Sequence, residues 1–262
     1  MQKKKAVFFD VDGTLWDFNN YIPDSTVEAI RSLRKNGHLA FICTGRCRAH
    51  IYAPELLQIG FDGIISACGT MIEYNGETLF YKKLENDLVA RTIEVLRRYG
   101  AHTLLEGREY IYVDETEFGD DAFVKKIKKE LGERLLTISG EWGRWEISKF
   151  TCTTKNIDQK ACLAELEDDY DFLIHKGDVV ELVPKGFDKA TGVKRICEIL
   201  GLDISETFAF GDGVNDFGML KTVGTGIAMG NGSDTAKAAA DYVTAPLRED
   251  GIWKACRHFG LI

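Results

Sequence analysis

Short, almost wholly apolar segments that alternate with helical patterns constrain the fold of this chain more than any other feature. Three such segments occur early in the sequence: Ala6–Phe9, Leu39–Cys43 and Gly63–Ala67. A strand that is covered on both faces is apolar along its whole length, as in parallel sheets with helical crossovers. Between the first two segments, apolar residues recur at helical spacing until Gly37, and Ser25 with Glu28 predicts a capping box at the start of that helix. The pattern therefore predicts an α/β fold with a parallel sheet.

The same pattern returns near the end of the chain after a different middle part. A helix is predicted over Lys189–Leu200, followed by strands over Thr207–Phe210 and Gly226–Met229. The middle part has amphipathic helical patterns and strand-like runs but few glycine-rich turns, and it is large enough for a small domain. Its main predicted elements are helices over Leu84–Tyr99 and Asp121–Leu131 and strands over residues 145–152 and Val179–Val183. We therefore expect a core domain made of residues 1–80 and 185–262, with an α+β domain inserted over residues 81–184.

The composition excludes several functional classes. The formal net charge is −8 and the sequence pI is about 5.3, whereas a protein that grips nucleic acid is usually basic. The seven cysteines form no C-x-x-C pair, which fits a reducing compartment. No apolar stretch is long enough to span a membrane, and the first one is too short for a signal peptide. We expect a cytoplasmic protein without nucleic-acid or membrane partners.

Polar residues of catalytic type stand directly after three of the predicted strands. In open α/β sheets, ligands bind at the carboxyl ends of the strands. A lysine at the start of a late helix completes the set. The four stretches are Asp10-Val11-Asp12-Gly13-Thr14, Thr44-Gly45-Arg46, Lys189 and Gly211-Asp212-Gly213-Val214-Asn215-Asp216.

Taken together, these stretches resemble the motifs of the haloacid dehalogenase superfamily of phosphohydrolases. The resemblance covers essentially the full chain, and the middle part resembles the C2B cap of the Cof-type branch. It implies a Rossmann-like parallel-sheet core with an inserted α+β cap domain. Two positions depart from the Cof-type pattern: Cys68-Gly69-Thr70 stands where Asn-Gly-Ala is common, and Ala190 follows Lys189 where glycine is usual.

A phosphate ester is an anion, so an attacking carboxylate needs a cation to offset the repulsion. Mg²⁺ prefers a few hard oxygen ligands and keeps several waters. Asp10 and Asp212 are the natural carboxylate ligands, because they follow strands that we expect to be neighbours. The resemblance implies that the backbone carbonyl of Asp12 is a third ligand, and that Asp216 holds the waters of the metal or a neighbouring ligand.

Asp10 is the candidate nucleophile, because an aspartate can form an acyl phosphate and divide one difficult displacement into two steps. Asp12 lies two residues further on and can reach the same site from the turn. Its predicted role is to protonate the leaving alkoxide and then to deprotonate the attacking water.

The remaining candidates bind the phosphoryl group. Thr44 and the amides near Gly45 suit an anion site, and Lys189 supplies a compact positive charge. By resemblance, Asn215 helps to position the phosphoryl group or its lysine partner. Arg46 either contacts a substrate anion or forms a salt bridge that supports the loop.

The sequence thus predicts a Mg²⁺-dependent phosphatase for a small phosphorylated metabolite, most simply a sugar phosphate. Two alternatives stay open: a sugar phosphomutase or other phosphotransferase with the same aspartyl-phosphate chemistry, and a non-catalytic phosphate-sensing module. Trp142, Arg144 and Trp145 either line a sugar pocket or pack within the inserted domain. The oligomeric state is not predicted.

Overall fold

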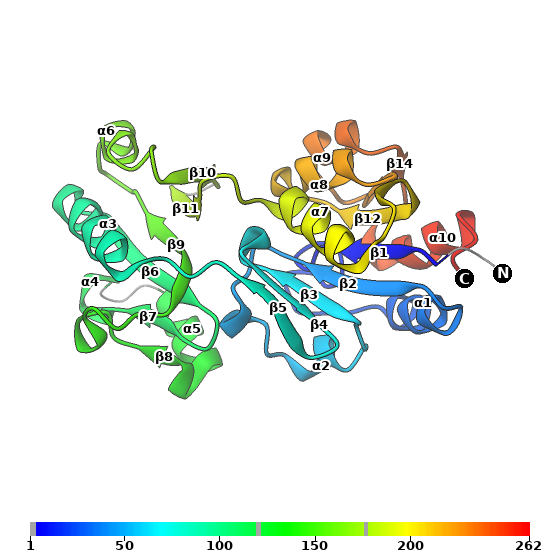
Figure 1. Cartoon of the computed structure of the whole chain (residues 1–262), viewed down its shortest axis with the longest axis horizontal. Helices are drawn as coiled ribbons and strands as arrows, with labels where there is room; N and C mark the ends of the chain where they lie inside the picture. The colour runs from blue at the N-terminus through cyan, green and yellow to red at the C-terminus, as the bar shows by residue number, and fades with distance from the viewer. Residues whose placement is uncertain (1–3, 119–121, 176–177) are drawn as a thin grey trace. The chain divides into compact units, whose positions relative to one another are not determined.

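The two ends of the chain fold together, and the middle part folds separately (Figure 1). The computed structural model describes residues 4–118, 122–175 and 178–262. Its first compact unit comprises the chain up to Gly45, Tyr52–Phe80 and Asp188–Ile262, and its second comprises Arg46–Ile51 and Tyr81–Phe187. We describe each unit by itself.

An eight-stranded sheet forms the centre of the first unit, in the order β14-β13-β12-β1-β2-β3-β4-β5. The strands from β14 to β3 run parallel to one another, and β4 runs antiparallel to β3. Their bounds are β1 (Ala6–Phe9), β2 (Leu39–Cys43), β3 (Gly63–Ser66), β4 (Met71–Tyr74), β5 (Glu77–Tyr81), β12 (Thr207–Gly211), β13 (Thr225–Ala228) and β14 (Tyr242–Val243). The predicted α/β fold with a parallel sheet is confirmed, whereas β4 and β5 were not predicted.

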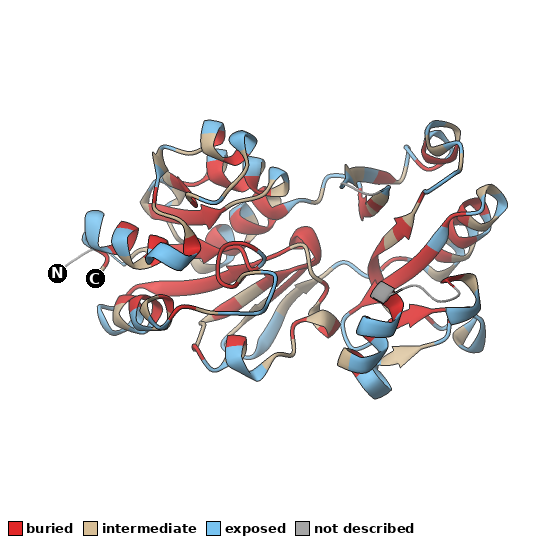
Figure 2. Ribbon diagram, turned by 180° about the vertical axis from the view of Figure 1, so that it is seen from behind, coloured by how far each residue is buried: buried red, intermediate tan, exposed pale blue. Residues whose placement is uncertain are grey.

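Helices cover both faces of this sheet, which explains why its central strands are apolar throughout (Figure 2). The helices are α1 (Asp24–Lys35), α2 (Pro54–Leu57), α7 (Lys189–Leu200), α8 (Phe217–Thr222), α9 (Asp234–Ala239) and α10 (Gly251–His258). On one face, Phe8 stacks on Phe41 with ring centroids 5.2 Å apart, within a cluster that includes residues of α7 and α8. The next residue, Phe9, points to the other face and stacks on Phe210 at 5.0 Å.

The second unit is built on a six-stranded sheet in the order β10-β11-β9-β6-β7-β8. Its pairs are antiparallel, except that β7 and β8 are parallel. The elements are β6 (His102–Gly107), β7 (Ile111–Val113), β8 (Leu135–Leu136), β9 (Ile147–Thr153), β10 (Tyr170–Ile174), β11 (Val179–Pro184), α3 (Asn86–Tyr99), α4 (Glu115–Phe118), α5 (Ala122–Leu131) and α6 (Gln159–Ala164). Residues of α3 and α6 pack on one sheet face around Leu105, Phe150 and Leu182. Asp121, the predicted start of α5, lies outside the described residues.

The predicted capping box at the start of α1 is wrong. Helix α1 begins at Asp24 after Pro23 and has no side-chain cap, so the predicted capping box does not form. Ser25 lies inside the first turn, and its hydroxyl donates to Asp250 Oδ1 at 2.7 Å instead.

Trp145 is fully buried in the core of the second unit, and its indole N–H donates to the carbonyl of Ile138, so it packs rather than lining a pocket.

The cysteines and helices add two findings. In the part of the chain that the structure describes, none of the seven cysteines forms a disulfide bond, and all seven are buried. Within the described part of the chain, no helix combines the length and the apolar character that a membrane crossing requires.

His38 is a titratable group buried in the core of the first unit. It lies just before β2 with 3% of its surface exposed, and its Nδ1 accepts a hydrogen bond from the backbone N–H of Lys5 at 3.2 Å. Within the described residues, its Nε2 is buried without a hydrogen-bond partner. Burial, followed by the nearby charge of Lys5, lowers the pKa of His38 below its ordinary value.

We predict that protonation of His38 destabilises the fold. Because the pKa is lowered in the folded state, the unfolded chain binds more protons below about pH 6.5, and the free energy of unfolding falls as the pH decreases through that range. Melting temperatures of the wild type and of His38→Asn, measured from pH 7.5 to pH 5.0, should diverge, with the wild type losing more stability on acidification. Parallel curves for the two proteins would contradict this prediction.

Candidate active site

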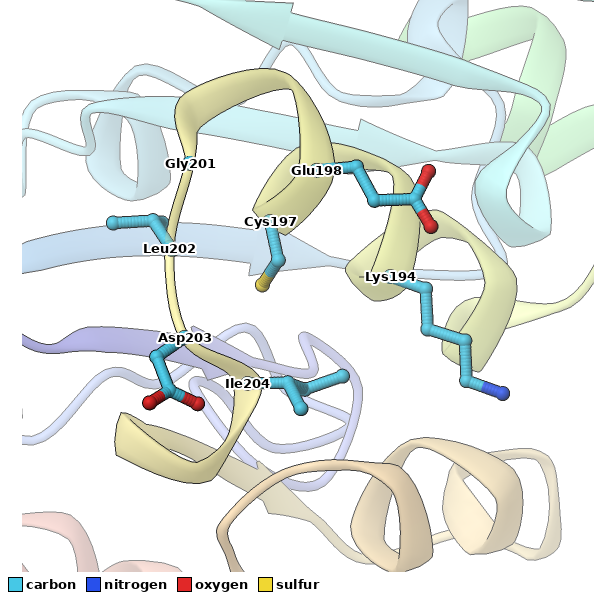
Figure 3. A pocket seen from close by; sticks show the side chains of 7 residues that line it. All are labelled: Lys194, Cys197, Glu198, Gly201, Leu202, Asp203 and Ile204. Carbon is cyan, nitrogen blue, oxygen red and sulfur yellow. The ribbon is translucent and has the colours of Figure 1, made fainter.

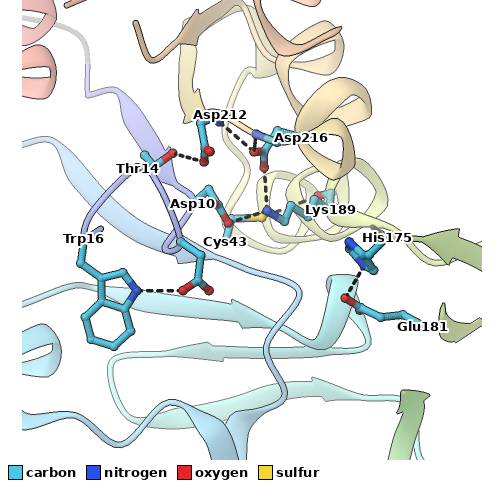
Figure 4. Close-up of polar contacts among 11 residues, drawn as sticks. Asp10, Thr14, Trp16, Cys43, His175, Glu181, Lys189, Asp212 and Asp216 are labelled. Carbon is cyan, nitrogen blue, oxygen red and sulfur yellow. Dashed lines mark hydrogen bonds and ion pairs between the residues drawn. The ribbon is translucent and has the colours of Figure 1, made fainter. Parts of the chain in front are cut away.

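The pairing of β1 with β12 brings two aspartates together. The two strands run parallel, with Phe9 opposite Phe210, so the residues that follow them leave the sheet at the same edge. Oxygen atoms of Asp10, Asp212 and Asp216 all lie within 4.8 Å of one another (Figure 4). Side chains that are some two hundred residues apart in the sequence thus share one small volume.

Lys189 is the cation of this cluster. It is the first residue of α7, whose N-terminus is fixed by a capping box between Asp188 and Thr191. Its Nζ lies 2.5 Å from Asp10 Oδ1 and 2.6 Å from Asp216 Oδ1. Although burial alone would lower the pKa of Lys189, the two carboxylates raise it well above its ordinary value, so the amine stays charged.

Asp216 holds the loop after β12 in shape. Its Oδ1 accepts from Lys189, and its Oδ2 accepts from the backbone N–H groups of Asp212 and Gly213 at 2.9 and 2.8 Å. Because both oxygens already have protein donors, Asp216 suits an indirect role beside a metal better than direct coordination.

The electrostatics of the cluster fit a divalent cation. Burial raises the pKa of Asp10 well above its ordinary value, and the neighbouring Asp216 charge raises it further. Burial and the Asp216 charge likewise raise the pKa of Asp212 to about 6. The three carboxylates outnumber the ammonium of Lys189, which forms ion pairs with Asp10 and Asp216, and their oxygens are the hard donors that Mg²⁺ prefers. Asp10 and Asp212 are the residues that would hold the metal, which would favour their ionised forms.

Asp12 and its neighbours form the turn that leads away from Asp10. The Asp12 side chain is exposed, and its Oδ1 accepts from the indole N–H of Trp16 at 2.9 Å. Gly13 has a φ of +89°, and any Cβ there would collide with the carboxylate of Asp212, which explains why this position is a glycine. Thr14 Oγ1 donates to Asp212 Oδ1 at 3.1 Å.

Asn231 is a contact to this turn that the sequence did not reveal. Its Nδ2 donates to the carbonyl of Gly13, and its Oδ1 accepts from the backbone N–H of Leu247, both at 2.8 Å. It therefore ties the turn to the C-terminal segment. A Gly-Asn-Gly sequence after the predicted strand was the available signal, but such a sequence is typical of any turn.

The remaining predicted site residues do not all lie in the same unit as the carboxylate cluster. Thr44 directly follows β2 and is buried, and its backbone N–H donates to the carbonyl of Ile65. Asn215 lies half-buried in the same loop as Asp212. Gly45 ends a segment of the first unit, whereas Arg46 begins the short segment that belongs to the second unit. The structure therefore does not assign Arg46 to the carboxylate cluster.

The second unit contains a buried ionic cluster of its own, which the sequence did not predict. Lys149 on β9 is 2% exposed and forms ion pairs with Glu106 on β6, at 3.4 Å, and with Glu181 on β11. Thr151 donates to Glu106, and His175 Nε2 lies 2.8 Å from Glu181 Oε1 (Figure 4). Although burial would raise the pKa of Glu181, the charge of Lys149 lowers it to about 2, so the pair is ionised at neutral pH.

A pocket of about 390 Å³ lies in the first unit but does not contain the predicted site residues (Figure 3). It is formed by the last turns of α7 and the segment that follows, including Cys197, Leu202 and Ile204. Lys189 is at the opposite end of the same helix. The carboxylate cluster, not this pocket, is the candidate active site.

Comparisons with known proteins agree with this geometry. The family model of haloacid dehalogenase-like hydrolases matches residues 7–256. The Bacillus subtilis (strain 168) protein YkrA is 32% identical over 276 residues, which cover 98% of each chain. The 5-amino-6-(5-phospho-D-ribitylamino)uracil phosphatase YitU of the same strain is 26% identical, again over 98% of each chain. A solved structure of a HAD subclass IIB sugar phosphatase is 32% identical, with a TM-score of 0.84 over 99% of this chain and 100% of that chain.

We predict that loss of Lys149 destabilises the second unit strongly. Lys149→Met would leave the carboxylates of Glu106 and Glu181, which lie on the strands on either side of β9, without their buried lysine partner, which should lower the free energy of unfolding by about 3–5 kcal/mol. Urea unfolding followed by tryptophan fluorescence would report on both units, because Trp142 and Trp145 lie in the second unit and Trp16 and Trp253 lie in the first.

Lys126→Met is the matched control in the same unit. Lys126 is 62% exposed and pairs with Glu130 at 3.7 Å, so its loss should cost less than about 1 kcal/mol. Equal effects of the two substitutions would show that the buried cluster contributes no more than a surface pair.

Proposed function

We propose that this chain, which belongs to the haloacid dehalogenase-like hydrolases, is a Mg²⁺-dependent phosphatase that acts on a sugar phosphate or a similar small ester. The observation that carries the proposal is the group of Asp10, Asp212 and Asp216 with Lys189 at one edge of the parallel sheet, in which Asp212 is half-buried and the other three are buried. This group combines a nucleophile, a metal site and a fixed positive charge, which is what phosphoryl transfer requires.

In the first step, a carboxylate oxygen of Asp10 attacks phosphorus, and the bond between phosphorus and the ester oxygen breaks. Asp12, in its acid form, gives its proton to the departing alkoxide, which leaves as an alcohol. Lys189, with its ammonium 2.5 Å from Asp10, holds the nucleophile and stabilises the charge that develops on the phosphoryl oxygens. Thr44 and the amides near Gly45 bind the same oxygens, and Asn215 helps to position them.

In the second step, water attacks the phosphorus of the aspartyl phosphate. Asp12, now a carboxylate, takes a proton from that water, and the carboxylate of Asp10 is released together with inorganic phosphate. The hydrogen bond from Trp16 to Asp12 holds the acid–base residue at a fixed place on the turn. A bound Mg²⁺ supplies charge neutralisation in both steps.

The leaving group in this proposal is polar and hydroxylated, as in a sugar phosphate. We infer that the inserted second unit acts as a cap, which favours small substrates and limits access of water during turnover. A relative with the same fold is a sugar phosphatase.

We predict that phosphate release depends on Asp10 and on a divalent cation. In an assay over a panel of phosphate esters, EDTA should abolish release and added Mg²⁺ should restore it. Asp10→Asn should reduce kcat on the order of 10³-fold or more, because the amide is not a nucleophile. Near-normal turnover by a folded Asp10→Asn protein would exclude the covalent mechanism. Turnover that appears only after a sugar bisphosphate is added would identify a phosphomutase instead.

We predict a different defect for Asp12→Asn. An aryl ester such as p-nitrophenyl phosphate has a good leaving group, so its first step needs little acid catalysis, whereas hydrolysis of the aspartyl phosphate still needs a base. Rapid mixing should therefore show a burst of about one nitrophenolate per enzyme, followed by slow turnover. A uniform decrease without a burst would assign Asp12 another role.

A further inference from the structure

Two glycines meet where helix α7 approaches the end of β3. Gly192 lies inside the first turns of α7, where glycine is less favourable than alanine. A Cβ at Gly192 would lie 2.6 Å from Ile65 Cγ2 and 2.9 Å from the Cα of Gly69. Helix propensity therefore does not explain this residue, whereas the close approach does.

The partner of Gly192 is a turn with an unfavourable backbone. Ala67, Cys68 and Gly69 have φ values of 48°, 54° and 83°, and the first two carry side chains that disfavour this left-handed region. Thr70 closes the turn, because its backbone N–H and its hydroxyl both donate to the carbonyl of Ala67, at 3.2 and 2.9 Å. A Cβ on Gly69 would collide with the carbonyl oxygen of Asp188 and lie 3.0 Å from the backbone nitrogen of Gly192.

This turn contacts the backbone on both sides of the proposed phosphoryl site. The N–H of Cys68 donates to the carbonyl of Thr44 at 3.2 Å, at the end of β2. On the other side, Gly69 touches the backbone of Asp188, the residue before Lys189. The strained backbone is thus located where it can set the distance between two groups that bind the same phosphoryl oxygens.

We propose that the Gly69–Gly192 contact is a positioning device for Lys189, an inference that rests on the proposed function for its catalytic consequence. Lys189 reaches Asp10 at 2.5 Å and Asp216 at 2.6 Å at the same time, so its helix has little freedom to move. A methyl group at the contact would push the first turn of α7 away from the strand ends. Lys189 would then lose at least one of its two partners.

Gly192→Ala tests this inference, because helix propensity and positioning predict opposite outcomes. As an isolated helix substitution it should be neutral or stabilising. As a positioning change it should lower kcat about tenfold or more, because a misplacement of about 1 Å at a catalytic group can cost up to 10²-fold. Competitive inhibition by inorganic phosphate should weaken in parallel, since Lys189 is expected to bind that anion.

Two further variants separate positioning from general destabilisation. Gly37→Ala strains another left-handed glycine (φ +91°) that has no atom within 4 Å of the added Cβ, so it should lower the melting temperature and leave kcat unchanged. Ile65→Ala combined with Gly192→Ala removes the atom nearest to the added methyl group and should regain part of the lost kcat. Without such a gain, the contact would not be the cause.

A crystal structure of Gly192→Ala supplies a readout that does not need turnover. We expect the Lys189 nitrogen to lie beyond hydrogen-bond distance of Asp10 or of Asp216. A structure in which both ion pairs persist would overturn the inference, even if kcat of the variant is lowered. If the wild type releases no phosphate from any ester, the proposed function fails, and the structural comparison still decides the positioning role.

Discussion

The buried ion pairs of Lys189 with Asp10 and Asp216 are the interaction on which the candidate active site depends. Charges that are withdrawn from water are costly unless each has a partner at close range, and Lys189 is 2% exposed while Asp216 is fully buried. One ammonium cannot neutralise all the carboxylates gathered here. Burial, followed by the neighbouring negative charge of Asp216, raises the pKa values of Asp10 and Asp212. A site of this kind is unfavourable for the isolated protein and favourable for a cation and a phosphoryl group.

The fold maintains this arrangement through backbone contacts more than through side chains. The β1–β12 pairing sets the separation of Asp10 and Asp212, and the amides after β12 orient Asp216. Asn231 holds the turn that carries Asp12 by its carbonyl at Gly13. Because each of these contacts includes a backbone group, the positions of the charged side chains follow from strand order and turn geometry.

This dependence explains what the sequence could predict. Strand ends are readable because a wholly apolar run stops at a polar residue, as Phe9 does at Asp10, and parallel strands place such ends together. The α/β fold was predicted from this pattern and from the family resemblance, and the candidate site stretches were chosen on the same grounds.

What the sequence did not reveal depends on tertiary context. Lys149 stands in a strand where a lysine would ordinarily be solvated, and only its pairing with Glu106 and Glu181 across neighbouring strands explains its burial. The predicted capping box at Ser25 does not form for a similar reason. The Ser25 hydroxyl donates a hydrogen bond to Asp250, which lies near the other end of the chain. The same holds for the contact between Asn231 and Gly13.

The order of the two units along the chain indicates a second role for the contacts that anchor α7. The chain returns from the second unit to the first between Phe187 and Asp188, immediately before Lys189. If the inserted unit moves as the proposed cap, its motion acts on the backbone next to Lys189. The capping box at Asp188 and the glycine contact at Gly192 fasten the helix just after this crossing. These two contacts would keep the Lys189 ammonium beside Asp10 while the second unit moves. The strained backbone at Ala67 and Cys68 would then persist because it is part of this anchor.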